Sequence, residues 1–138
     1  MRIIIDTNVL VSAIFFNGGL PKDILDLVEL GKIKHIASQE IIQEYKDTFA
    51  RIAIREERYD KAVALNKFIP KIEIIETTTN LQICRDPDDD KFINCAIDGK
   101  CKYIVSGDKD LLVLENVENV EIITIRDFME EYKKTIEN

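Results

Sequence analysis

The chain has 138 residues, a formal net charge of −7, and 46% hydrophobic and 33% charged residues. These values exclude a disordered chain and predict one domain of ordinary size over residues 1–138. No apolar run approaches the roughly 20 residues of a membrane span, and a strand-like start at residues 1–3 excludes a signal peptide, so we expect a cytoplasmic protein.

The first half of the chain predicts two strands and four helices. Residues 2–5 form a short apolar run that is typical of a buried strand. Pro21 opens a helix that Gly31 ends, and Ser38 is a good N-cap for the helix after it. In chain order we expect a strand at 2–5, helices at 8–16 and 21–30, a strand at 33–37, and helices at 39–50 and 55–68.

The second half continues the alternation of strand and helix. Phe92, Ile93, Ala96 and Ile97 repeat at helical spacing, and Gly99 ends that helix. Alternation of this kind predicts an α/β fold with three layers, in which helices cover both faces of a central parallel sheet of about five strands. The elements expected here are a strand at 72–75, a helix at 88–98, a strand at 103–105, a helix at 109–114, a strand at 121–125 and a helix at 126–134.

Three cysteines are present, without the paired spacing of a zinc site. An odd number of cysteines in a reducing compartment predicts free thiols that are buried or half-buried. They are Cys84, Cys95 and Cys101.

Four acidic residues are the most informative feature of the sequence. Asp6 and Asp108 each follow an expected strand, Glu44 lies near the edge of the buried face of a helix, and Asp90 lies at the start of another helix. Ligands of parallel α/β sheets bind at the carboxyl ends of the strands. Two carboxylates ~4 Å apart repel each other by about 4 kcal/mol near the protein surface. A cluster of this kind therefore predicts a hard cation, with Mg²⁺ or Mn²⁺ as the natural candidates.

Such a centre suits the hydrolysis of phosphodiesters, which needs activated water and stabilisation of charge on the phosphoryl and leaving oxygens, from one ion or from two. Asp6 and Asp108 are expected to bind the metal directly. Asp90 is expected to share an ion or orient its water, and Glu44 to coordinate through water or act as general base. Asn8 and Ser106 are candidates for holding the acids by hydrogen bonds, with Asp110 as a supplementary ligand.

Structural roles compete with these assignments. Asp88 and Asp89 are rivals of Asp90, because acidic residues stabilise a helix N-terminus in any fold. Asp110 also suits a cap of the short helix after Asp108, and Glu44 also suits a solvated helix surface.

Four acidic motifs follow one another along the chain. They are Asp6-Thr7-Asn8-Val9-Leu10, Glu44, Asp86-Pro87-Asp88-Asp89-Asp90-Lys91-Phe92 and Ser106-Gly107-Asp108-Lys109-Asp110-Leu111. Taken in this order, they resemble the motifs of the PIN-domain nucleases, and in particular of small single-domain toxins similar to VapC-like ribonucleases. The resemblance covers essentially the whole chain. It implies Mg²⁺- or Mn²⁺-dependent cleavage of RNA, a homodimer, and neutralisation by a cognate antitoxin protein, with catalytic acids at Asp6, Glu44, Asp90 and Asp108.

Net negative charge argues against a large RNA-binding surface. Seven of the 13 aspartates fall between residues 86 and 110, however, where a cation would neutralise them. We expect a groove between the two subunits of a dimer to concentrate basic groups for RNA, for example Lys91, Lys109 and Arg126. The alternatives are a PIN-like module without catalysis, binding nucleic acid or protein, and a receiver-type phosphotransferase domain, which lacks its accepting aspartate after the strand at 72–75.

Overall fold

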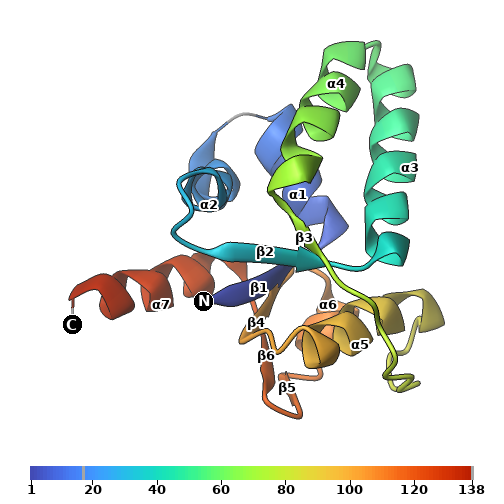
Figure 1. Cartoon of the computed structure of the whole chain (residues 1–138). Helices are drawn as coiled ribbons and strands as arrows, with labels where there is room; N and C mark the ends of the chain where they lie inside the picture. The colour runs from blue at the N-terminus through green and yellow to red at the C-terminus, as the bar shows by residue number, and fades with distance from the viewer. Residues whose placement is uncertain (17, 138) are drawn as a thin grey trace.

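The computed structural model describes residues 1–16 and 18–137 and contains one six-stranded sheet (Figure 1). The strand order is β3-β2-β1-β4-β6-β5. All neighbouring pairs are parallel except β5 with β6, which is antiparallel. The strands are β1 (Arg2–Ile5), β2 (Lys34–Ala37), β3 (Glu73–Ile74), β4 (Tyr103–Val105), β5 (Asn116–Val117) and β6 (Val120–Ile123).

Helices cover both faces of this sheet, as predicted for an α/β protein. In Figure 1 the first four helices stand above β2, whereas α5 and α6 lie below β2 and beside β4 and β6. No described helix combines the length and the apolar character needed to cross a membrane. The helices are α1 (Thr7–Phe15), α2 (Gly19–Glu29), α3 (Gln39–Glu56), α4 (Tyr59–Phe68), α5 (Asp90–Asp98), α6 (Lys109–Leu112) and α7 (Ile125–Glu137), with 3₁₀ turns η1 (Ile69–Lys71) and η2 (Pro87–Asp89).

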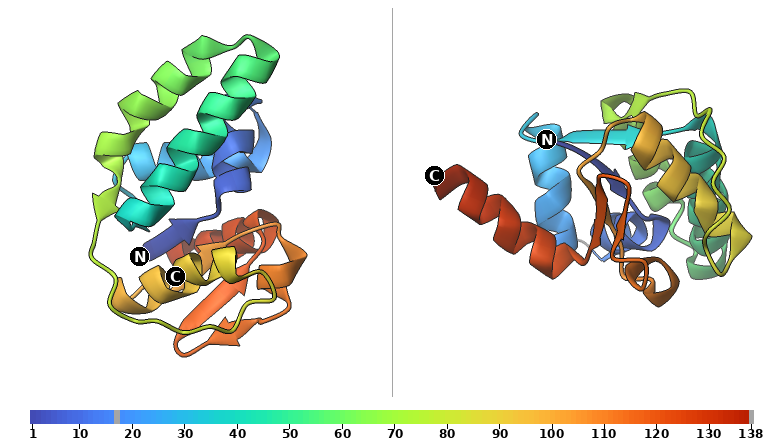
Figure 2. Two further views of the ribbon diagram at one scale, coloured as in Figure 1. Left: turned by 90° about the vertical axis from the view of Figure 1, so that its right-hand side faces the viewer. Right: turned by 90° about the horizontal axis from the view of Figure 1, so that it is seen from below.

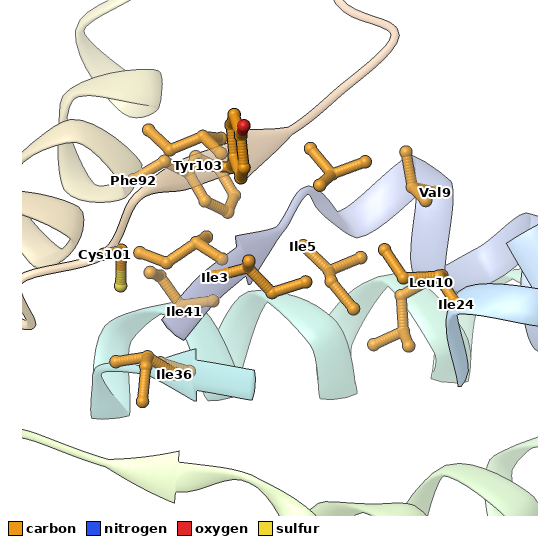
Figure 3. Packing of buried hydrophobic residues seen from close by; sticks show 14 of the residues in the cluster. Ile3, Ile5, Val9, Leu10, Ile24, Ile36, Ile41, Phe92, Cys101 and Tyr103 are labelled. Atoms are coloured by element: carbon orange, nitrogen blue, oxygen red, sulfur yellow. The ribbon is translucent and has the colours of Figure 1, made fainter. Parts of the chain in front are cut away.

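Burial of the central strand on both faces explains its continuous apolar run. Ile3, Ile4 and Ile5 of β1 are all fully buried, as expected for a parallel strand with helices on each side. Side chains such as Ile41 of α3 and Phe92 of α5 pack around this strand (Figure 3). The core therefore holds β1 rigidly and fixes the place where it ends, at Asp6.

The largest differences from the predicted boundaries lie where α3 ends and α4 begins. The third helix does not end near residue 50 but continues to Glu56, and α4 begins at Tyr59 instead of residue 55. The break falls at Glu57, which adopts a left-handed conformation with φ of 53°. Residues 51–56 contain no glycine or proline to signal an earlier end. The sheet also has one more strand than expected, the two-residue β5.

The connection from β3 to α5 is long and lies along the outside of α5 before reaching its N-terminus (Figure 2). Asn94 of α5 fixes this segment, because its side chain accepts from the Leu81 N–H (2.9 Å) and donates to the Leu81 carbonyl (3.2 Å). The three cysteines are free thiols, with Cys84 half-buried and the other two buried, which confirms that prediction.

Candidate active site

Strand order brings the ends of β1 and β4 together. These two strands are neighbours at the centre of the sheet, with Ile5 opposite Val105. Strand connections leave β1 toward β2 on one side, while β4 lies on the other, so the crevice between them is the topological switch point where α/β folds bind ligands. Asp6 and Asp108 therefore flank the position at which the fold favours a site.

A serine hydroxyl joins these two acidic segments. Ser106 Oγ donates to Asp6 Oδ2 over 2.6 Å, and it accepts from the Asp108 backbone N–H over 3.0 Å. Both Asp6 and Ser106 are buried, with exposed fractions of 6% and 1%. The predicted supporting residue Ser106 thus fixes the Asp6 carboxylate and the loop that carries Asp108.

Asp108 also belongs to a cluster of three carboxylates. Asp89, Asp108 and Asp110 are half-buried, and one oxygen of each lies within 4.8 Å of the others. Asp108 Oδ1 also accepts from the Asp110 backbone N–H at 2.9 Å, which caps the short helix α6. Asp108, and not Asp110 as expected, therefore caps α6, and Asp110 contributes a carboxylate to the cluster.

Burial and mutual repulsion raise the pKa values of Asp89, which belongs to this cluster, and of Asp6, which lies outside it. The pKa of Asp89 rises to about 7, chiefly because of burial and then because of the charges on Asp108, Asp86, Asp6 and Glu44. Burial also raises the pKa of Asp6, against the opposing effect of the Ser106 hydrogen bond. Strongly perturbed carboxylates in a cleft are typical of functional sites.

Asp90 has a different environment from Asp89. Its Oδ1 accepts from the backbone N–H groups of Ile83 (3.1 Å) and Cys84 (2.9 Å). Burial acts to raise the pKa of Asp90, but these bonds and one to the Cys84 thiol hold it below the ordinary value. The geometry thus favours Asp89 over Asp90 for the third acidic position, an assignment that remains a prediction.

Glu44 reaches the cluster from α3 and is held on both of its oxygens. The Thr7 hydroxyl donates to Oε2, and Lys91 Nζ lies 2.6 Å from Oε1. Thr7 directly follows Asp6, so this contact ties α3 to the end of β1. Glu44 is therefore no solvated helix residue, since only 24% of its side chain is exposed.

Lys91 was expected to bind RNA at the surface, and that expectation is wrong. Only 7% of its side chain is exposed, because the ammonium lies between Glu44 and Asp88, 2.9 Å from Asp88 Oδ1. Burial acts to lower the pKa of Lys91, but the hydrogen bonds to these carboxylates raise it overall. One sequence signal points to this internal pairing: a cation in the first turn of a helix opposes the helix dipole unless acidic groups surround it.

An open pocket of about 680 Å³ lies beside the cluster, with Asn8, Asp108, Lys109 and Asp110 in its lining. Asn8 is exposed there; in the described part of the chain its side chain forms no hydrogen bond to the acids. Lys109 and Arg126 are exposed, as expected for groups that meet a phosphate backbone.

The residues present fit a hard divalent cation. All the converging donors are carboxylate oxygens, which Mg²⁺ and Mn²⁺ prefer over nitrogen or sulfur. A bound cation would also offset the repulsion that raises the pKa values of Asp6 and Asp89. The pocket beside them leaves room for waters and for a phosphate group.

Comparisons with known proteins agree with this architecture. A family profile described as "PIN domain" matches residues 2–110. The uncharacterized protein MJ1680 of Methanocaldococcus jannaschii is 36% identical over 149 aligned positions, which cover 99% of this chain and 94% of that protein. A chain from the crystal structure of VapBC2 from Rickettsia felis, bound to a DNA fragment from their promoter, is similar in fold. Its TM-score is 0.61 at 17% identity, covering 88% of this chain and 97% of that chain.

Proposed function

Because the chain belongs to the PIN-domain family, we propose that it is a divalent-metal-dependent endoribonuclease that hydrolyses phosphodiester bonds of RNA. One observation carries the proposal: oxygens of Asp89, Asp108 and Asp110 lie within 4.8 Å of one another at the carboxyl end of the sheet. Carboxylates this close repel each other strongly unless a cation or a proton neutralises them.

In this proposal some of the acids bind the metal ion directly, whereas Glu44 orients water. We assign direct coordination of Mg²⁺ or Mn²⁺ to Asp6, Asp89 and Asp108. An ion held by these residues would supply Lewis-acid chemistry toward the phosphoryl oxygens and would lower the pKa of bound water. Glu44, already bonded to Thr7 and Lys91, has an outer role and orients water. Ser106 keeps the Asp6 carboxylate in position through its hydrogen bond.

Cleavage of a mixed-sequence RNA by the purified protein tests this proposal. We expect cleavage with Mg²⁺ or Mn²⁺, none with a chelator, and a loss of at least about 100-fold in Asp108→Asn, because one ligand of the ion is gone. Asp60→Asn is the matched control, since Asp60 is an exposed aspartate that pairs with Arg58 on the hairpin of α3 and α4. Equal activity of wild type and Asp108→Asn would refute the assignment.

We further propose that the protein is the toxin of a toxin–antitoxin pair, acts in the cytoplasm as a homodimer, and is neutralised by a small antitoxin. The similarity in fold to a chain of the VapBC2 crystal structure supports this part of the proposal. A short reading frame for a DNA-binding protein next to the gene, whose product co-purifies with this chain and stops cleavage, is the expected finding. Retention of full activity with that neighbouring product would contradict it.

The alternative is a PIN-like module that binds nucleic acid or protein without catalysis. The net charge of −7 favours a module that binds protein, because both binding and cleavage of RNA need cations for the phosphate backbone. Calorimetry separates the two functions: the nuclease requires Mn²⁺ binding that Asp108→Asn removes, whereas an inactive module requires no divalent ion.

A further inference from the structure

A buried lysine lies at the side of the acidic cluster, and neither the family profile nor the proposed function assigns it a role. Lysine is almost never fully buried unless it is paired. The Lys91 ammonium is 2.6 Å from Glu44 and 2.9 Å from Asp88, and its side chain is 7% exposed. Since Asp88 is 71% exposed, Glu44 is the partner that shares the desolvated environment of Lys91.

The contacts of Lys91 leave Glu44 little freedom to bind a metal. One Glu44 oxygen faces the ammonium and the other accepts from the Thr7 hydroxyl. To become a direct ligand, Glu44 would have to leave a charge-assisted contact in a half-buried environment, where such contacts are strong. The same move would leave the Lys91 ammonium paired only with exposed Asp88.

Sites with two metal ions hold them ~3.5–4 Å apart and need carboxylates on both sides to offset their charge. On the side of α3, Glu44 would supply such a carboxylate, and the Lys91 ammonium already matches its charge. A second divalent ion there would also meet the positive charge of Lys91 at short range. We propose that Lys91 is a positioning residue that restricts the cluster to a single divalent ion by occupying, with its ammonium, the place of a second one; this inference rests on the proposed metal site.

Counting bound Mn²⁺ tests the inference without any activity measurement. Electron paramagnetic resonance of free Mn²⁺, with the full-length chain at neutral pH, gives the number of ions per chain. We expect one ion for the wild type and one for Lys91→Arg, which keeps the charge. Lys91→Met removes the charge at similar length, and we expect it to bind a second ion, because Glu44 is then unpaired.

A double variant is the control for an altered fold of the Lys91→Met protein. Lys91→Met combined with Glu44→Gln removes both members of the pair, and we expect it to return to one ion. Two ions in the wild type, or an unchanged count of one in folded Lys91→Met, would overturn the inference. If Lys91→Met does not fold, Glu44→Gln alone decides: one ion in this variant supports an outer Glu44, and loss of the ion overturns it.

The RNA assay separates this inference from the proposed function. Cleavage by the wild type that Asp108→Asn abolishes, together with an unchanged ion count in Lys91→Met, rejects the role of Lys91 and keeps the nuclease. No cleavage by the wild type, together with a second ion in Lys91→Met, rejects the nuclease and keeps the role of Lys91.

Discussion

Ser106 donates its hydroxyl hydrogen to Oδ2 of Asp6 over 2.6 Å, across residues that are 100 positions apart in sequence. The contact exists because β1 and β4 pair in parallel and end at the same level. It orients the Asp6 carboxylate, which is buried and has few other hydrogen-bond donors near it.

We expect Ser106→Ala to weaken Mn²⁺ binding by about 10–100-fold, the usual effect of removing a group that orients a metal ligand. The loss of a partner for a buried carboxylate should also cost about 1–3 kcal/mol of stability. Ser38→Ala is the control, because Ser38 caps α3 by accepting from the Ile41 N–H and its loss should cost about 1 kcal/mol. Metal affinity that falls equally in both variants would mean that lost stability alone explains the effect.

Asp89 and Asp90 are both candidates for the third acidic position, and their asparagine variants distinguish between them. We expect Asp89→Asn to lower Mn²⁺ affinity by about 10-fold or more, because a charged ligand of the ion is lost. Asp90→Asn should change it by less than about threefold, because an asparagine oxygen still accepts from the N–H groups of Ile83 and Cys84. Calorimetric titration of both variants measures the difference, and the reverse order would return the assignment to Asp90.

In the presence of a chelator, Asp89→Asn should be more stable than the wild type. Burial and neighbouring acids raise the pKa of Asp89 to about 7 in the folded state, so its ionisation above pH 7 opposes folding. Because Asp89 is half exposed and screened by solvent, we expect a gain of only about 1 kcal/mol. Thermal unfolding at pH 8 with and without Mn²⁺ measures it. A gain that persists in saturating Mn²⁺ would contradict a metal ligand at this position.

The sequence predicted the acids at strand ends better than those at helix starts. Asp6 follows three isoleucines that can only be a buried strand, and parallel pairing then brings it beside Ser106. Asp89 and Asp90 differ by one residue, which rotates a side chain by about 100° around a helix. Which of them faces Asp108 depends on the contact of Asp90 with residues 83–84, a tertiary feature that has no local signal. The burial of Lys91 is likewise a tertiary feature, because it follows from the position of α3.

His35 gives the protein a defined pH dependence of stability. It is fully buried, and burial lowers its pKa to about 3. Tyr45 donates its hydroxyl hydrogen to the Ile5 carbonyl and lies 3.1 Å from His35 Nε2. The hydrogen-bond network therefore assigns the proton to Nε2 and leaves Nδ1 without a partner among the described residues.

The direction in which stability changes with pH follows from the binding of a proton to His35. Unfolded His35 takes up a proton near pH 6.5 and folded His35 does not, so its contribution is complete above pH 6.5 and is lost as the pH falls toward 3. Between pH 6.5 and 5 we expect the wild type to lose about 1.5 kcal/mol relative to His35→Gln, which keeps a donor for Tyr45. Urea unfolding at several pH values measures this difference between the two proteins. The opposite pH trend in stability that Asp89 causes is the same in both proteins and therefore drops out of the comparison. Parallel curves for the two proteins would mean that folding does not lower the pKa of His35.

Recognition of RNA should depend on exposed cations near the pocket, in spite of the net negative charge. Lys109 lines the pocket, and Arg126 follows its lining residue Ile125. Changing Lys109 or Arg126 to Glu in an Asp108→Asn background, which binds without cleaving, should weaken the affinity for single-stranded RNA. Each lost phosphate contact should lower the slope of log affinity against log salt by about 0.7. Lys67→Glu on α4 makes the same change of charge at an exposed position outside the pocket lining. If it weakens binding equally, total charge governs the affinity and the surface beside Asp108 does not.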